Sequence, residues 1–254
     1  MQRTLWVAVC ATLSAGAFAD GNDLINPDRP GIADGSFVVG HHFQVEVGYQ
    51  EELHDGGHTR LIFIPTLLRI GVNSAWEFRI EGNTLTYADS FGMRSTGYQP
   101  ISAGAKYHFM DAKGTKRPSL GFIGRVFPAI GSAGFQSDKT TADLRLAGDW
   151  NLNDQWELNP NVGVADYEDG AGNMFTAGLF AMTLNYNPTP ILNFFVDTGM
   201  QSPEQSHGKT QVIVDAGVAY IVGRNVQLDF SVGQGISGTT SPRPFVGAGV
   251  SVRF

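Results

Sequence analysis

Histidine side chains are the first candidates for chemistry in this sequence. The six histidines are at positions 41, 42, 54, 58, 108 and 207. His54 and His58 are four residues apart with Asp55 between them, and His207 could join them through folding. Zinc sites use three or four imidazole, thiolate or carboxylate ligands. One histidine pair in a polar loop provides too few ligands, so we expect no metal site and no cofactor.

A serine–histidine hydrolase is the second possibility. Ser102, Lys106 and His108 occupy even positions of one alternating segment, so their side chains would share the polar face of a strand. A lipid hydrolase needs its nucleophile at the acyl chains, on the apolar face. The segment Gly131-Ser132-Ala133-Gly134 also lacks the strand-to-helix context of a nucleophile elbow. We therefore expect no catalytic residues, and a membrane-embedded lipid hydrolase stays a less favoured alternative.

Charged residues spaced two apart form a more extensive group. Within residues 76–81, acidic and basic side chains alternate with Trp, Phe and Ile. Because successive side chains of a strand point to opposite faces, this pattern gives each strand one charged and one apolar face. The same pattern along the chain predicts fifteen inward-facing, pore-lining charges: Glu46, Arg69, Glu77, Arg79, Glu81, Lys106, Arg125, Asp143, Arg145, Asp149, Glu157, Asp197, Asp215, Asp229 and Arg253.

This set of nine acidic and six basic side chains permits two interpretations. It could form an ion-pair network that fills and stiffens the interior, or a charged constriction that selects solutes. Opposite charges are interspersed along the chain, which favours the network. The two roles are compatible with one another.

The elements that must position these side chains are β-strands. Alternation predicts twelve of them, joined by short turns and longer polar loops in succession. Residues 88–97 are expected to form one of the loops. The predicted strands are residues 41–50, 60–71, 76–87, 98–109, 118–127, 140–150, 155–165, 174–186, 190–201, 210–221, 226–234 and 244–254.

The overall composition agrees with strands that have one apolar and one polar face. Mean hydropathy is −0.08, and 16% of the residues are charged. The sequence lacks the repeated apolar runs of about 20 residues that membrane-spanning helices require. Strand alternation with short and long connections in succession is typical of outer-membrane barrels. We therefore predict an all-β protein: a single antiparallel up-and-down transmembrane β-barrel of about 12 strands, embedded in outer-membrane lipids of a Gram-negative bacterium, with both termini periplasmic.

The N-terminal region divides into two parts before the barrel. Residues 1–19 resemble a secretory signal peptide, with Arg3, an apolar stretch and the cleavage motif Ala17-Phe18-Ala19. Cleavage would remove Cys10, the single cysteine, and leave sixteen basic against twenty-four acidic residues, a formal charge of −8. This charge gives no reason to expect nucleic acid as a partner.

Residues 20–40 are rich in Gly, Asp, Asn and Pro and are expected to form a periplasmic N-terminal segment. Within it, Asp28 and Arg29 are plug candidates, because they could enter the barrel mouth and pair with inward charges. The barrel itself is predicted to occupy residues 41–254.

Six sequence blocks, taken in their order along the chain, carry a resemblance to a known family. They are Asn26-Pro27-Asp28-Arg29-Pro30-Gly31, Gln44-Val45-Glu46-Val47-Gly48, Leu68-Arg69-Ile70-Gly71, Trp76-Glu77-Phe78-Arg79-Ile80, Ser102-Ala103-Gly104-Ala105-Lys106-Tyr107 and Phe127-Pro128-Ala129-Ile130-Gly131. They resemble the MetA-pathway phenol-degradation family of outer-membrane transporters. Two residues depart from the family pattern: Gly31 stands where Asp is more usual after Asp-Arg-Pro, and Ala129 stands in place of Thr. The resemblance implies an outer-membrane barrel that passes aromatic or hydrophobic compounds.

The C-terminus resembles the signal that the outer-membrane assembly machinery reads, because Phe254 follows apolar Val252 and Val250. Together these features predict a passive channel for small, aromatic or hydrophobic solutes. A structural or partner-binding barrel with a closed lumen is the alternative.

Overall fold

The computed structural model describes residues 24–254, and the predicted signal peptide lies outside the described residues. Among residues 24–254, no helix has the length and apolar character needed to span a membrane. A three-residue 3-10 helix, η1, covers Asp55–Gly57. The strands are β1 (Phe43–His54), β2 (Thr59–Gly71), β3 (Trp76–Ser90), β4 (Met93–Gly97), β5 (Ser102–Met110), β6 (Ser119–Phe127), β7 (Thr141–Asn151), β8 (Trp156–Glu168), β9 (Met174–Thr189), β10 (Leu192–Ser202), β11 (Gln211–Ile221), β12 (Val226–Ser237) and β13 (Phe245–Arg253).

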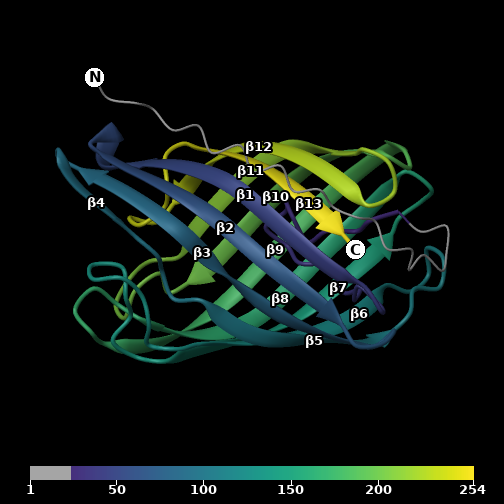
Figure 1. The fold of residues 1–254 in the computed structure, drawn as a ribbon, viewed down its shortest axis with the longest axis horizontal. Coiled ribbons are helices and arrows are strands. Elements are labelled where there is room, and N and C mark those ends of the chain that lie inside the picture. Colours follow the sequence, from purple (N-terminus) through teal and green to yellow (C-terminus); the bar gives the residue numbers. More distant parts are fainter. Residues whose placement is uncertain (1–23) are drawn as a thin grey trace, which may run out of the picture.

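The strands form one closed antiparallel barrel (Figure 1). β1 pairs with β2 on one side and with β13 on the other, which closes the sheet. β4 and β5 both pair with β3 in one continuous register, with Gly97 opposite Thr86 and Ser102 opposite Glu81. They therefore occupy a single place in the wall. The predicted all-β barrel of twelve strand positions is confirmed.

The prediction of a loop at residues 88–97 is wrong. β3 extends to Ser90 and turns directly into β4 through Phe91 and Gly92, which both have positive φ. Two central residues with positive φ give a tight hairpin whose twist matches that of the strands. The predicted strand 98–109 begins later than expected, because β5 starts at Ser102 and residues 98–101, after the end of β4 at Gly97, are not in a strand. Pro100 lies in this gap and has no N–H group for the ladder.

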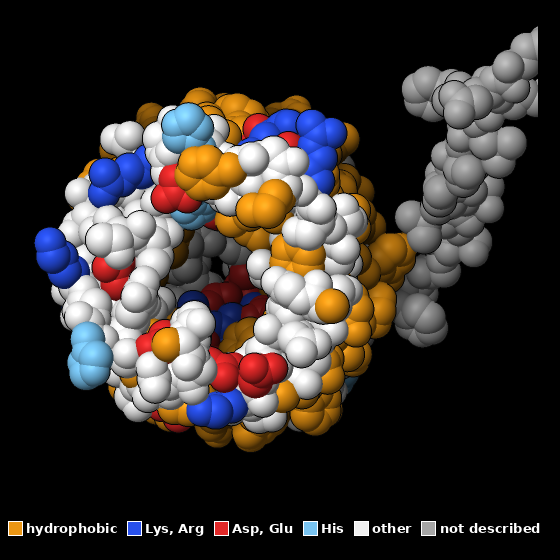
Figure 2. Space-filling model, turned by 90° about the vertical axis from the view of Figure 1, so that its left-hand side faces the viewer, with side chains coloured by type: hydrophobic (Ala, Val, Ile, Leu, Met, Phe, Trp, Pro, Cys, Tyr) orange, Lys and Arg blue, Asp and Glu red, His pale blue; other side chains and the backbone are white. Residues whose placement is uncertain are grey.

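The barrel has an apolar exterior and a polar interior, the reverse of a soluble protein. Phe78, Val162 and Val196 are each more than half exposed, and they alternate along their strands with buried or half-buried residues. The buried set is dominated by polar and charged side chains. Figure 2 shows apolar side chains around the perimeter and charged side chains in the central hollow. A hydrocarbon surrounding explains this arrangement, because a charge on the lipid face would cost about 2–4 kcal/mol near the midplane.

The two ends of the barrel differ in their connections. Short turns such as Val72–Ala75 define the turn end, and longer loops define the loop end. In two of these turns, an Asn side chain accepts two backbone hydrogen bonds. Asn73 accepts them from the amides of Ala75 and Trp76, and Asn153 from the amides of Gln155 and Trp156. The tryptophans, Trp76 and Trp156, are each more than one-third exposed. Exposed tryptophans at a strand end are typical of a membrane interface.

Candidate functional site: the barrel interior

Residues 24–40, here called the N-terminal segment, run inside the barrel (Figure 1, purple). Their backbone amides bond to inward carboxylates of the wall. The Arg29 amide donates to Glu46 at 2.9 Å, and the Ser36 amide donates to Asp149 at 2.7 Å. The Val39 amide donates to Glu77 at 2.9 Å. Buried backbone N–H groups need partners, and wall carboxylates supply them here in place of a sheet.

The structure places all fifteen predicted charges on the inner side of the wall. Eleven are buried, and Glu81, Arg145, Glu157 and Arg253 are half-buried. Arg253, at the turn end, donates to Asn225 at 2.9 Å and to the Leu24 carbonyl at 3.3 Å. Glu157 accepts a bond from Asn159 at 2.7 Å.

Five cations gather on adjacent strands, which we call the basic wall. The carboxylate of Asp28, in the N-terminal segment, contacts three of them: Lys106 at 2.9 Å, Arg69 at 3.5 Å, and Arg79. Asp34 lies 3.2 Å from Arg79 and 3.4 Å from Arg145. The plug candidate Asp28 thus lies at the centre of a buried ion cluster. The basic wall consists of Arg69 on β2, Arg79 on β3, Lys106 on β5, Arg125 on β6 and Arg145 on β7.

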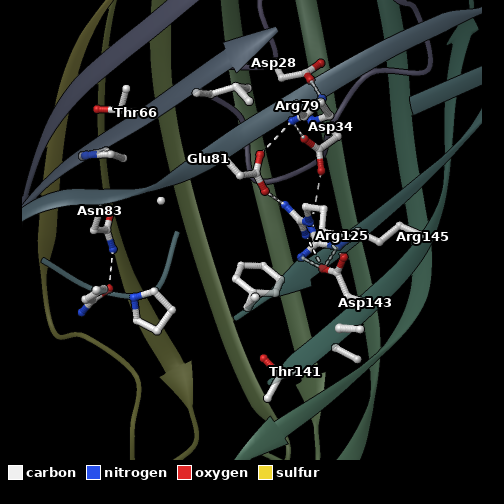
Figure 3. Close-up of a pocket in the computed structure, with 18 of the residues that line it drawn as sticks. Asp28, Asp34, Thr66, Arg79, Glu81, Asn83, Arg125, Thr141, Asp143 and Arg145 are labelled. Atoms are coloured by element: carbon white, nitrogen blue, oxygen red, sulfur yellow. Dashed lines mark hydrogen bonds and ion pairs between the residues drawn. The ribbon is translucent and has the colours of Figure 1, made fainter. Parts of the chain in front are cut away.

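Acidic side chains of the same strands complete this network. Glu77 accepts two bonds from Arg69, each 2.9 Å long. Arg125 donates to both Glu81 and Asp143, and Figure 3 shows these groups in one continuous chain of contacts. Removing one partner from such a buried pair leaves an uncompensated charge. The network therefore fixes its members in place.

The opposite side of the barrel is acidic. Asp197 on β10, Asp215 on β11 and Asp229 on β12 are buried, and we call them the acidic wall. β11 lies six places from β5 around the twelve-place barrel, so the two walls face each other. The second plug candidate, Arg29, reaches Asp229 at 3.3 Å. The charges are interspersed on β2 to β7, where Glu77, Glu81 and Asp143 pair with the cations, whereas the inward charges of β10 to β12 are acidic only.

Amide side chains form a group that charge counting missed. The side chain of Asn193 donates to Asn185 at 3.0 Å and to Asn187 at 2.9 Å. Asn185 donates in turn to Asn159, and Asn159 donates to Asp149 at 2.6 Å. This ladder crosses β7 to β10 near the turn end. The recurrence of Asn at odd-numbered positions in the predicted strands was the feature of the sequence that could have indicated this ladder.

Several cavities border the N-terminal segment. The loop-end cavity, about 590 Å³, lies between Phe127, Tyr167 and the Arg79–Arg125 network. A cavity of about 430 Å³ lies beside Asp215 and Phe245, and we call it the acidic-wall cavity. A turn-end cavity of about 340 Å³ lies beside the amide ladder. Arg29 and Gly31 line all three, so the segment separates them.

The histidines do not come together. His54 lies 3.0 Å from Glu52, and the His58 ring stacks on Phe91 at the loop end. His108 contacts the Ser36 carbonyl and Asp111. Ser102 donates instead to the backbone of Glu81. Within residues 24–254, no group of three or more His, Cys, Asp or Glu side chains has an arrangement that could hold a metal ion.

Phe254 lies at the seam that closes the barrel. Its amide donates to the Phe43 carbonyl at 2.7 Å, and the two rings lie 6.1 Å apart. The C-terminal residue therefore joins β13 to the beginning of β1.

The outer loops are held by carboxylates of their own. Asp169 accepts bonds from the amides of Ala171 and Asn173, each 2.9 Å long, and from the Ser206 hydroxyl at 2.5 Å. These bonds, led by that of Ser206, lower the pKa of Asp169 to about 2. Glu204 accepts two bonds from Thr239, each 2.8 Å long. The loops after β8, β10 and β12 are thus tied together at the loop end.

A closed antiparallel barrel with an apolar exterior, interfacial tryptophans and a charged interior is an outer-membrane β-barrel. The chain belongs to the family described as "Putative MetA-pathway of phenol degradation", which matches residues 27–254. The resemblance found in the sequence blocks is therefore confirmed. No curated protein matches the sequence.

Several solved structures share the fold. An outer membrane channel from Pseudomonas putida F1 has a TM-score of 0.67 and 12% identity, with 94% of this chain and 100% of that chain covered. The NanC porin has a TM-score of 0.56 and 12% identity, covering 83% and 98%. The KdgM porin, in complex with disordered oligogalacturonate, has a TM-score of 0.55 and 11% identity, covering 82% and 99%. At these identities, the likeness establishes the fold.

Proposed function

We propose that the barrel is a passive outer-membrane channel for small solutes. The observation that supports this most directly is the hollow interior, with cavities of about 590, 430 and 340 Å³ around one thin segment. A barrel of about eight strands has an interior that side chains can fill, and twelve strands enclose a wider one. The similar folds are those of channels and porins. Diffusion through such a pore needs no cofactor or energy source.

The loop-end cavity favours small solutes with an apolar ring. Phe127, Tyr167 and Leu67 supply apolar surface, while Asn83 and Gln99 supply hydrogen-bonding groups. The Arg125 guanidinium lies 5.7 Å from the centre of the Phe127 ring, so the same patch carries a cation. Pockets of this kind bind through apolar contact and a few placed polar groups. The family description, which refers to phenol degradation, agrees with this solute class.

Two measurements test the channel. Refolded protein in a planar bilayer should give discrete conductance steps. Cells that produce it should take up phenols, benzoates or alkanes faster than cells without it. Tyr167→Ala should change the uptake of ring compounds, whereas Tyr220→Ala, on the exposed outer face of β11, should not. A barrel that neither conducts nor accelerates uptake would overturn the proposal.

The alternative of a closed structural barrel rests on the Asp28 cluster, which binds the N-terminal segment to the basic wall. It predicts a complete absence of conductance, so the bilayer measurement separates the two functions. We also propose that the protein is not an enzyme, because His108 and Ser102 bond to other partners. Lipase turnover in detergent that disappears in His108→Ala would contradict this.

We propose that the assembly machinery recognises the C-terminal strand through Phe254. The Phe254 bonds to Phe43 give it a second role in closing the seam. Phe254→Ala should reduce the fraction of protein assembled in the outer membrane, measured by heat-modifiable migration. Unassisted refolding into detergent should change less, because the assembly machinery takes no part in it. Equal losses in the two assays would contradict a recognition role.

A further inference from the structure

We propose that the route through the barrel runs between the N-terminal segment and the acidic wall, that it favours cations, and that Arg29 is a tethered counter-ion which closes it. This inference rests on the proposed channel function and adds the selectivity of the pore and the residues that set it.

The N-terminal segment is attached unequally to the two walls. On the basic wall, Asp28 and Asp34 reach Arg69, Arg79, Lys106 and Arg145, and Lys106 also donates to the Phe37 carbonyl at 3.2 Å. A route on that side would require several buried ion pairs to separate, and each would leave a buried charge without its partner.

The contacts with the acidic wall are fewer and simpler. Arg29 pairs with Asp229, and the Ile32 amide donates to Asp197 at 3.0 Å. Gln227 donates to the Arg29 carbonyl at 3.0 Å. Displacement of the single Arg29 side chain would therefore break the one ion pair between the segment and Asp229.

The Arg29 side chain lies in a seat made by two glycines. Gly48 on β1 and Gly249 on β13 are opposite each other in the sheet register. A Cβ atom at Gly249 would lie 2.7 Å from the Arg29 Nε, and one at Gly48 would overlap the Arg29 Cζ. Any larger residue at either position would displace the guanidinium. This pair of glycines therefore makes room for Arg29 beside Asp229.

Two cavities meet at this seat. The acidic-wall cavity and the turn-end cavity share Arg29, Pro30 and Gly31 in their lining. Movement of Arg29 would join the acidic-wall cavity, about 430 Å³, to the turn-end cavity, about 340 Å³. Joined in this way, they would connect the loop-end half of the interior with the amide ladder near the turn end.

Two carboxylates of the acidic wall border this route: Asp215 lines the acidic-wall cavity, and displacement of Arg29 would free Asp229. One carboxylate oxygen of each of Asp197, Asp215 and Asp229 is buried with no hydrogen-bond partner among residues 24–254. Asp215 lies opposite Asp197 in the register and lines the acidic-wall cavity. Buried carboxylates attract cations and repel anions, as in the acidic rings of cation channels. Arg29 would be the resident cation that a solute cation replaces.

The first test uses Arg29→Gln in a planar bilayer with a KCl gradient. Conductance and the ratio of K⁺ to Cl⁻ permeability should each rise by about twofold or more. Arg94→Gln is the matched control, because Arg94 is an exposed cation that pairs with Asp89 and lines none of the three cavities described above, and it should leave conductance near the wild-type value. Asp215→Asn should lower the permeability ratio. An anion-selective pore, or an Arg29→Gln variant that conducts like the wild type, would overturn the inference while leaving the channel function intact.

The second test changes the seat without changing any charge. Gly48→Ala should displace Arg29 and raise conductance as Arg29→Gln does, because the three atoms nearest a Cβ atom at Gly48 all belong to the Arg29 guanidinium. Gly247→Ala is the control, since Gly247 lies on the inner face of neighbouring β13, where a Cβ atom would be 3.1 Å from the Ser231 hydroxyl and meets no atom of Arg29. Equal conductance of the two alanine variants would contradict the seat. Absence of conductance in the wild type and every variant would instead reject the proposed channel function.

Discussion

The carboxylate of Asp28 and the ammonium of Lys106 lie 2.9 Å apart inside the barrel, although 78 residues separate them along the chain. This contact joins the N-terminal segment to β5, and Arg69 and Arg79 add further contacts to the same carboxylate. One aspartate thus contacts three buried cations from three strands.

We expect Asp28→Asn to destabilise the barrel, because three cations would lose a shared counter-charge. The free energy of unfolding should fall by about 3 kcal/mol, the size found when one member of a buried ion pair is removed. Urea unfolding in lipid vesicles measures it. Asp154→Asn, in an exposed turn, applies the same chemical change and should alter stability by less than about 0.5 kcal/mol. Equal losses in the two variants would contradict the role of the cluster.

A reversible cross-link can test whether the segment must leave the basic wall. The hydroxyls of Ser36 and Ser119 lie 2.8 Å apart, and the sequence outside residues 1–19 has no cysteine. In Ser36→Cys/Ser119→Cys, oxidation would fasten the segment to β6. Conductance should be the same in the oxidised and reduced protein, because the proposed route lies on the opposite side. Loss of conductance on oxidation, with no effect in the single Ser36→Cys variant, would show that the segment has to move away from β6.

Strand alternation was sufficient to predict most of the fold and which face each charge occupies. It works because a charge on the lipid face is so costly that Glu77, Arg79 and Glu81 have to point inward. It could not predict the hairpin at Phe91 and Gly92, whose tight turn depends on positive φ values that the composition of the segment does not display.

Strand alternation could not predict the partners of the inward charges. A period of two gives the face of a side chain, but not what lies across the barrel from it. The difference between the two sides was nevertheless visible in chain order. Five of the predicted inward cations lie from Arg69 to Arg145, with acids among them. From Asp197 to Asp229, the predicted inward residues are all acidic. The seat of Arg29 could not be predicted from the sequence, because it depends on Gly48 and Gly249 becoming neighbours when the barrel closes.

Arg125→Gln should shift selectivity toward cations. The Arg125 guanidinium is shared by Glu81 and Asp143 at the loop-end cavity, so its loss leaves two carboxylates with less compensation. The reversal potential in a KCl gradient measures the shift. Arg60→Gln is the control, because Arg60 pairs with Glu51 at the exposed loop end, outside the three cavities described above. An unchanged reversal potential in Arg125→Gln would show that the charges at the loop-end cavity do not set selectivity.

The outer loops should keep their contacts to unusually low pH because of Asp169. Its pKa of about 2 is below the ordinary value of about 3.9, so folding of this loop favours the charged carboxylate. The stabilisation is complete above the ordinary pKa and is lost as pH falls toward 2. A carboxyl-carbon NMR titration should place the Asp169 midpoint near 2. Ser206→Ala removes the bond that contributes most and should raise the midpoint toward the ordinary value. A midpoint near 4 in the wild type, or no change in Ser206→Ala, would show that the Ser206 bond does not hold the loops together in solution.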